Sequence, residues 1–68
     1  MNPTAGLIIV RTISGATSYR LCHGRVLVWS TPAFSTEAGK AGACERLRQW
    51  LQAHPYRVVL AEYQEEVA

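Results

Sequence analysis

Residues 18–30, SYRLCHGRVLVWS, decide the fold, because they form two short β-rich runs that meet at a glycine. The first run alternates in polarity, and the second is rich in β-branched and aromatic residues, a composition typical of strands. Gly24 supplies the permissive backbone that a tight turn requires. The stretch therefore predicts a β-hairpin with strands over about 18–23 and 25–30.

Cross-strand partners share a face of a sheet and side chains alternate, so the hairpin sorts into two faces. A turn at His23-Gly24 and a turn at Gly24-Arg25 give the same sorting. One face carries Tyr19, Leu21, His23, Val26 and Val28, and the other carries Arg20, Cys22, Arg25, Leu27 and Trp29. We expect a helix to cover the first face and the second to stay open, unless a bulge interrupts the alternation.

Residues 7–13, LIIVRTI, predict a further strand, followed by turn residues at 14–17. An even number of loop residues would place Arg11 on the open face beside Arg20. An odd number would place Arg11 with Leu21, which burial disfavours. We therefore expect Arg11 on the open face.

Helical spacing follows over about 36–53, with Ser35 or Thr36 as the N-cap and Glu37 in the first turn. The predicted apolar stripe consists of Ala43, Cys44, Leu47, Trp50 and Leu51. The helix start, EAGKAGA, contains two glycines, which are unfavourable in a helix. Either the helix approaches a neighbour closely there, or a weak first turn costs little; we favour the second explanation.

Pro55 ends the helix, and residues 56–63 predict a last strand before an acidic end. The predicted fold is a small α+β domain over residues 1–68, in the order β-β-β-α-β. Its sheet is antiparallel, one helix packs on one face, and the fourth strand lies along one sheet edge. A swap of that strand into a second copy remains an alternative.

The chain of 68 residues is 49% hydrophobic and 18% charged, as in ordinary globular domains. A chain this short has a thin margin of stability, which makes a homodimer plausible. No stretch is long enough for a membrane span, and the N-terminus lacks the pattern of a secretory signal. Two cysteines are too few for a disulfide scaffold, so we expect a cytoplasmic protein without a membrane partner.

Charge is unevenly distributed along the sequence. Residues 1–36 contain Arg11, Arg20 and Arg25 and no acid, whereas residues 56–68 contain one arginine and three glutamates. A basic region before an acidic end favours an anionic partner, or contact with the protein's own tail.

Chemical motifs are absent from the sequence. Cys22, His23, Cys44 and His54 have no zinc-site spacing, and Gly39-Lys40 lacks the rest of a phosphate loop. The cysteines have no evident base beside them, and the chain contains no aspartate. We predict a protein that is not an enzyme and uses no cofactor or metal.

The candidate binding residues are Arg11, Arg20, Arg25, Leu27 and Trp29. Arginine and tryptophan are common hot spots of protein interfaces, and they also contact phosphates and bases. The leading hypothesis is a protein or protein–nucleic-acid complex as partner, and direct nucleic-acid binding is the alternative. A third reading is a structural homodimer: Trp29 closes it or packs beneath the tail, and the arginines pair with Glu62, Glu65 or Glu66.

The sequence resembles two known families. One resemblance lies in the run YRLCHGRVLVWSTPAFSTEAGKAGACERLRQWL, and the other lies in the plan of the chain as a whole. The hairpin followed by FSTEA and an alanine-rich helix resembles AP2 and integrase amino-terminal DNA-binding domains, which read the major groove with a three-stranded sheet. Arg20, Arg25 and Trp29 match that family in kind, whereas the usual aromatic helix endings are missing. The size, strand order and aromatic strand after the helix (here Tyr56) resemble small phage anti-CRISPR proteins. That resemblance implies an inhibitor or regulator of a macromolecular complex and assigns no residue.

Overall fold

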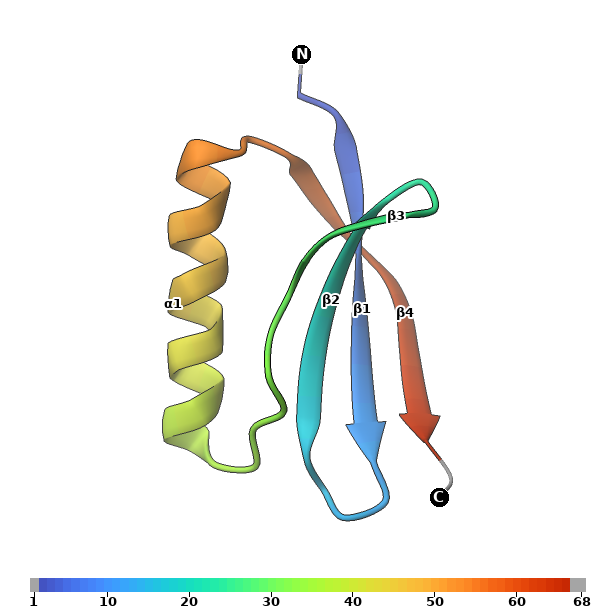
Figure 1. The fold of residues 1–68 in the computed structure, drawn as a ribbon, viewed down its shortest axis with the longest axis vertical. Helices are drawn as coiled ribbons and strands as arrows, with labels where there is room; N and C mark the ends of the chain where they lie inside the picture. The colour runs from blue at the N-terminus through green and yellow to red at the C-terminus, as the bar shows by residue number, and fades with distance from the viewer. Residues whose placement is uncertain (1, 67–68) are drawn as a thin grey trace.

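The structure is a computed structural model that describes residues 2–66, and it confirms a small α+β fold (Figure 1). Its elements in chain order are β1 (Thr4–Thr12), β2 (Thr17–His23), β3 (Val26–Ser30), α1 (Glu37–Ala53) and β4 (Arg57–Glu66). The helix lies beside β2, and β4 lies at the far side of the sheet. No helix in residues 2–66 has both the length and the apolar character needed to cross a membrane.

The four strands form one sheet in the order β3-β2-β1-β4. β1 pairs antiparallel with β2, and β2 pairs antiparallel with β3, as expected. β4 lies at an edge, but it runs parallel to β1, so the prediction of a purely antiparallel sheet was wrong. The reason is the crossover: β3 runs in the direction of β1, α1 carries the chain back, and the next strand must then run with β1.

A β-bulge in the hairpin moves Trp29 to the other face of the sheet. Gly24 has φ +63° at the first turn position, and Cys22 lies opposite Leu27, as a two-residue turn at Gly24-Arg25 requires. The register then shifts, and Trp29, not Val28, lies opposite Leu21. One extra residue reverses the alternation beyond it, so the expected placement of Trp29 on the open face was wrong.

The core lies between α1 and the half of the sheet formed by β1 and β2. Ala5, Tyr19 and Leu21 are buried on the helix-side face, and Ala43 is buried on the helix. The ring of Tyr19 meets that of Phe34 edge to face at 5.2 Å. Val10 lies on the opposite face, yet it is only 2% exposed, in a row between Ser18 of β2 and Gln64 of β4.

The helix begins as the sequence predicts. Thr36 is the N-cap, and its Oγ1 accepts a hydrogen bond from the Gly39 N–H at 3.0 Å. A Cβ at Gly39 would lie 2.8 Å from the Cβ of Phe34, so this glycine permits a close approach. Gly42 has open space around it, and there the explanation by a weak first turn stays a prediction.

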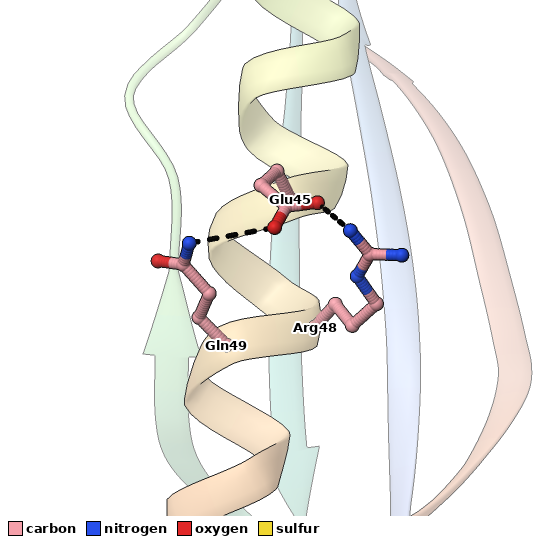
Figure 2. A network of polar contacts seen from close by, with 3 residues as sticks. All are labelled: Glu45, Arg48 and Gln49. Atoms are coloured by element: carbon pink, nitrogen blue, oxygen red, sulfur yellow. Dashed lines mark hydrogen bonds and ion pairs between the residues drawn. The ribbon is translucent and has the colours of Figure 1, made fainter.

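The outer face of the helix is polar, as the predicted stripe requires. Leu47, Trp50 and Leu51 are half-buried, whereas Cys44 is exposed at the margin of the stripe. Figure 2 shows Glu45 bound by the Arg48 guanidinium on one side and by the Gln49 amide, at 3.4 Å, on the other. These exposed contacts lie on the helix surface that faces away from the core.

Candidate binding surface

Arg20 and Leu27 lie on the sheet face opposite the helix, where the sequence predicts them. Leu27 is opposite Cys22, one position beyond Arg20 on the same face of β2. Leu27 is 53% exposed, and the exposed Arg20 lies beside Ile8 of β1. The open face therefore presents an apolar side chain next to a guanidinium.

Arg25 occupies the second position of the β2–β3 turn and is exposed. The neighbouring Val26 is 62% exposed but lies on the helix-side face, opposite His23. Arg25 at the hairpin tip thus continues the surface of Arg20 and Leu27, and we refer to Arg20, Arg25 and Leu27 as the hairpin surface. Among the side chains that the structure describes, those of residues 2–65, the single ion pair joins Arg48 to Glu45, so neither arginine of the hairpin surface is engaged in one there.

Trp29 belongs to an aromatic cluster on the helix side. Its ring centroid lies 6.4 Å from that of Trp50. Trp50 in turn stacks on His54 at 4.4 Å and on Tyr56 at 5.7 Å. Trp29 is half-buried in this arrangement and cannot serve a ligand bound to the open face.

Arg11 also lies on the helix-side face, because it is opposite Thr17, which shares a face with Tyr19. Five residues, an odd number, separate Arg11 from Thr17, so the expected even loop was wrong. The burial that disfavoured this placement does not arise, since Arg11 is exposed. The structure therefore separates Arg11 and Trp29 from the other three predicted residues.

Arg11 lines a groove of about 430 Å³ between the start of α1 and the strands β1, β2 and β4. The other lining residues are Ile9, Thr17, Tyr19, Phe34, Ser35, Thr36, Glu37, Lys40 and Tyr63. Burial raises the pKa of the Tyr19 phenol, and the nearby Cys44 thiol and Glu37 carboxylate raise it further. The groove is thus polar and of mixed charge at its rim, with a neutral phenol at its base.

Sequence reasoning missed Lys40 of this groove and the exposed apolar residues of β4. Leu60 and Tyr63 are opposite Leu7 and Ile9, so they lie on the helix-side face at the edge that the helix does not cover. They are 68% and 51% exposed. The element order makes β4 run in the direction of β1, and this direction, combined with pairing to β1, would have placed them.

No metal-binding arrangement is present among the described side chains of residues 2–65, where no three His, Cys, Asp or Glu side chains cluster. Both cysteines are free, with Cys22 on the open face and Cys44 on the helix. Comparisons with family models, with curated proteins and with solved structures found no match to the chain.

Proposed function

We propose that the protein is a small non-enzymatic binding protein that contacts a partner macromolecule through the hairpin surface. The observation that carries this proposal is the exposed Leu27, with Arg20 next to it and Arg25 at the adjoining turn. Interfaces commonly consist of an apolar centre with arginine at or near it. The surface therefore suits a protein partner whose own patch combines apolar side chains with carboxylates.

The charge of the hairpin surface supports an acidic partner. Residues 2–36 contain no acid, and the nearest glutamate on the open face, Glu62, lies two strands from Arg20 on the other side of Ile8. Unpaired guanidinium groups remain available for charge-assisted hydrogen bonds to a carboxylate. Such contacts fix orientation and accelerate association more than they add affinity.

The form of the activity is inhibition or regulation of a macromolecular complex in the cytoplasm. Its support is the resemblance of the sequence, in size and element order, to small phage anti-CRISPR proteins, which act by occupying a surface. Two free cysteines suit a reducing compartment. The apolar centre at Leu27 favours a protein over a nucleic acid, because Trp29, the expected stacking residue, lies on the other face.

Three variants test the proposal in parallel. Leu27→Asp and Arg20→Ala/Arg25→Ala change the hairpin surface, and Arg46→Ala/Arg48→Ala removes the same charge from the exposed part of the helix. Fluorescence anisotropy with labelled duplex and single-stranded DNA, at low and near-physiological salt, comes first. Affinity capture with the immobilised proteins follows, and binding of each captured component is then measured directly with purified chains.

A component that binds the wild type and the helix control but neither hairpin variant supports the proposal. DNA binding that falls steeply with salt and is lost in Arg20→Ala/Arg25→Ala would replace it with nucleic-acid recognition. Equal binding by all four proteins would refute a role for the hairpin surface.

A further inference from the structure

The outer edge of β4 is unpaired and carries exposed apolar side chains. β4 lies at the end of the sheet order, so its outer backbone groups have no strand partner within residues 2–66. Leu60 and Tyr63 project from this edge on the helix-side face, and Val59, 41% exposed, lies on the other face. An exposed edge of this kind is a template for pairing with another strand.

The direction of the edge groups follows from the register. The Arg57 N–H donates to the Pro3 carbonyl at 2.7 Å, so the backbone N–H and C=O groups of residue 57 point toward β1. A strand directs its backbone groups alternately to its two edges. The backbone groups of Val58 and Leu60 therefore point outward, away from β1. Ala61 is an extra residue relative to β1, whose pairing with β2 has no shift. Beyond Ala61 the alternation of the backbone groups is therefore reversed, and it is the backbone groups of Tyr63 and Glu65 that point outward.

This reversal restricts what can pair with the edge. A strand without a bulge can form hydrogen bonds with the outward backbone groups in one half of β4. In the other half, its own groups would then face residues whose backbone groups point inward, toward β1. A second β4 that runs antiparallel carries the same reversal at the same place. We propose that β4 pairs antiparallel with β4 of a second copy of this chain, so that two sheets join into one of eight strands.

One register satisfies both halves and centres on the bulge. In it Leu60 lies opposite Tyr63 of the second copy, and Val58 lies opposite Glu65; both are pairs of outward-pointing residues. Val59 lies opposite Gln64 of the second copy as a non-hydrogen-bonded pair on the open face. Each of these pairs also joins residues of the same face, as β-sheet pairing requires.

Side-chain chemistry favours the same arrangement. The two Leu60–Tyr63 pairs place four exposed apolar side chains in contact at the centre of the interface. Arg57 lies at the start of β4, whereas Glu62 and Glu65 lie in its second half. Antiparallel pairing therefore brings the basic end of each strand toward the acidic half of the other, and parallel pairing would bring like charges together.

The pairing also fixes the shape of the dimer. Antiparallel edge strands that share their faces are related by a twofold axis perpendicular to the sheet. Both helices then lie on one face of the eight-stranded sheet, and the Leu60–Tyr63 pairs lie in the trough between them. The hairpin surfaces lie at the two outer ends and remain free.

Sedimentation of the full chain over a range of concentrations is the first test. We expect a mass of twice 7.5 kDa for the wild type and a loss of at least tenfold in dimer affinity for Leu60→Asp and for Tyr63→Asp. Val26→Asp changes a similarly exposed residue at the opposite edge, β3, and should leave the dimer intact. Circular dichroism of each variant verifies the fold. A monomeric wild type at roughly millimolar concentration, or dissociation by Val26→Asp alone, would overturn the proposal.

Cysteine cross-linking tests the register. In a Cys22→Ala/Cys44→Ala background, Val59→Cys and Gln64→Cys chains are mixed and oxidised. A non-hydrogen-bonded pair has Cα atoms about 4.5 Å apart, which suits a disulfide. We expect the mixture to form heterodimers, whereas Val59→Cys alone should not cross-link, since its two copies would lie about 17 Å apart. Cross-linking of each variant with itself and none in the mixture would refute this register.

Discussion

The indole rings of Trp29 and Trp50 lie with their centroids 6.4 Å apart and their planes inclined by 37°, joining the last residues of the hairpin to the last turn of the helix. Offset and tilted aromatic pairs are favourable beyond the area that they bury. Trp50 continues the cluster to Tyr56, just before β4. Strand β3, helix α1 and the residue before β4 are thus connected through a single aromatic cluster.

The substitution Trp29→Ala should therefore lower the free energy of unfolding of the domain. A fully buried tryptophan changed to alanine costs about 3–5 kcal/mol, and for this half-buried ring we expect on the order of 2 kcal/mol. Urea denaturation followed by circular dichroism measures the loss. Leu27→Asp, on the open face, is the control and should leave the midpoint nearly unchanged. An unaltered midpoint for Trp29→Ala would contradict the helix-side placement.

The same substitution at two helix glycines should have opposite effects. Gly42→Ala should stabilise the protein by about 0.5–1 kcal/mol, because alanine costs less backbone entropy and nothing lies within contact distance. Gly39→Ala should destabilise it by about 1–3 kcal/mol, because the new methyl group would meet the Cβ of Phe34. Thermal unfolding of both variants measures the difference. Stabilisation by both would show that Phe34 moves aside freely.

Gly6 and Ala61 should be coupled across the β1–β4 bulge. A Cβ at Gly6 would lie 2.8 Å from the Cβ of Ala61. Gly6→Ala should therefore destabilise the sheet, and Ala61→Gly should recover part of the loss in the double variant. The double-mutant cycle should give a coupling free energy of about 1 kcal/mol. Additive effects of the two changes would argue against this contact.

Tyr19 should make stability fall at alkaline pH. Burial, with Cys44 and Glu37 nearby, raises the pKa of its phenol above the ordinary value of 10.0. The contribution is complete below pH 10.0 and is lost as the pH rises through the folded-state pKa, because the unfolded chain gives up the proton first. In Tyr19→Phe, the denaturation midpoints measured at pH 7 and above pH 10 should therefore differ less than they do in the wild type. A Tyr19→Phe variant that loses stability with rising pH as steeply as the wild type would contradict this role.

Sequence reasoning predicted the elements well, because each has a local signal. Gly24 indicates the hairpin turn, Thr36 the helix start, and the alternating polarity of β2 places Tyr19 and Leu21 in the core. The stripe around Ala43 likewise gives the buried side of the helix. These signals depend on residues close together in the chain.

The candidate site was only half predicted, because face assignments fail wherever one residue is inserted. The bulge at Val28 transfers Trp29 to the helix side, and the loop before Thr17 does the same to Arg11. Neither feature has a sequence signal of its own. In the hairpin, the packing of the half-buried Trp29 against Trp50, not local propensity, favours the shifted register. Leu27 precedes the extra residue of β3, and Arg20 lies on β2, which has none, so both were placed on the correct face.

The pairing of β1 with both its sequence neighbour and the most distant strand has a consequence for folding kinetics. The β1–β2–β3 meander can form from local contacts, whereas β1 meets β4 only after the whole intervening chain has been ordered. Closing that loop carries the largest entropic barrier in the molecule, and non-local pairing is slow. Until it closes, the central strand is itself an edge, with Leu7 and Ile9 open to other chains. Refolding at high concentration should therefore favour aggregation through β1, and this competition would limit the yield of folded protein.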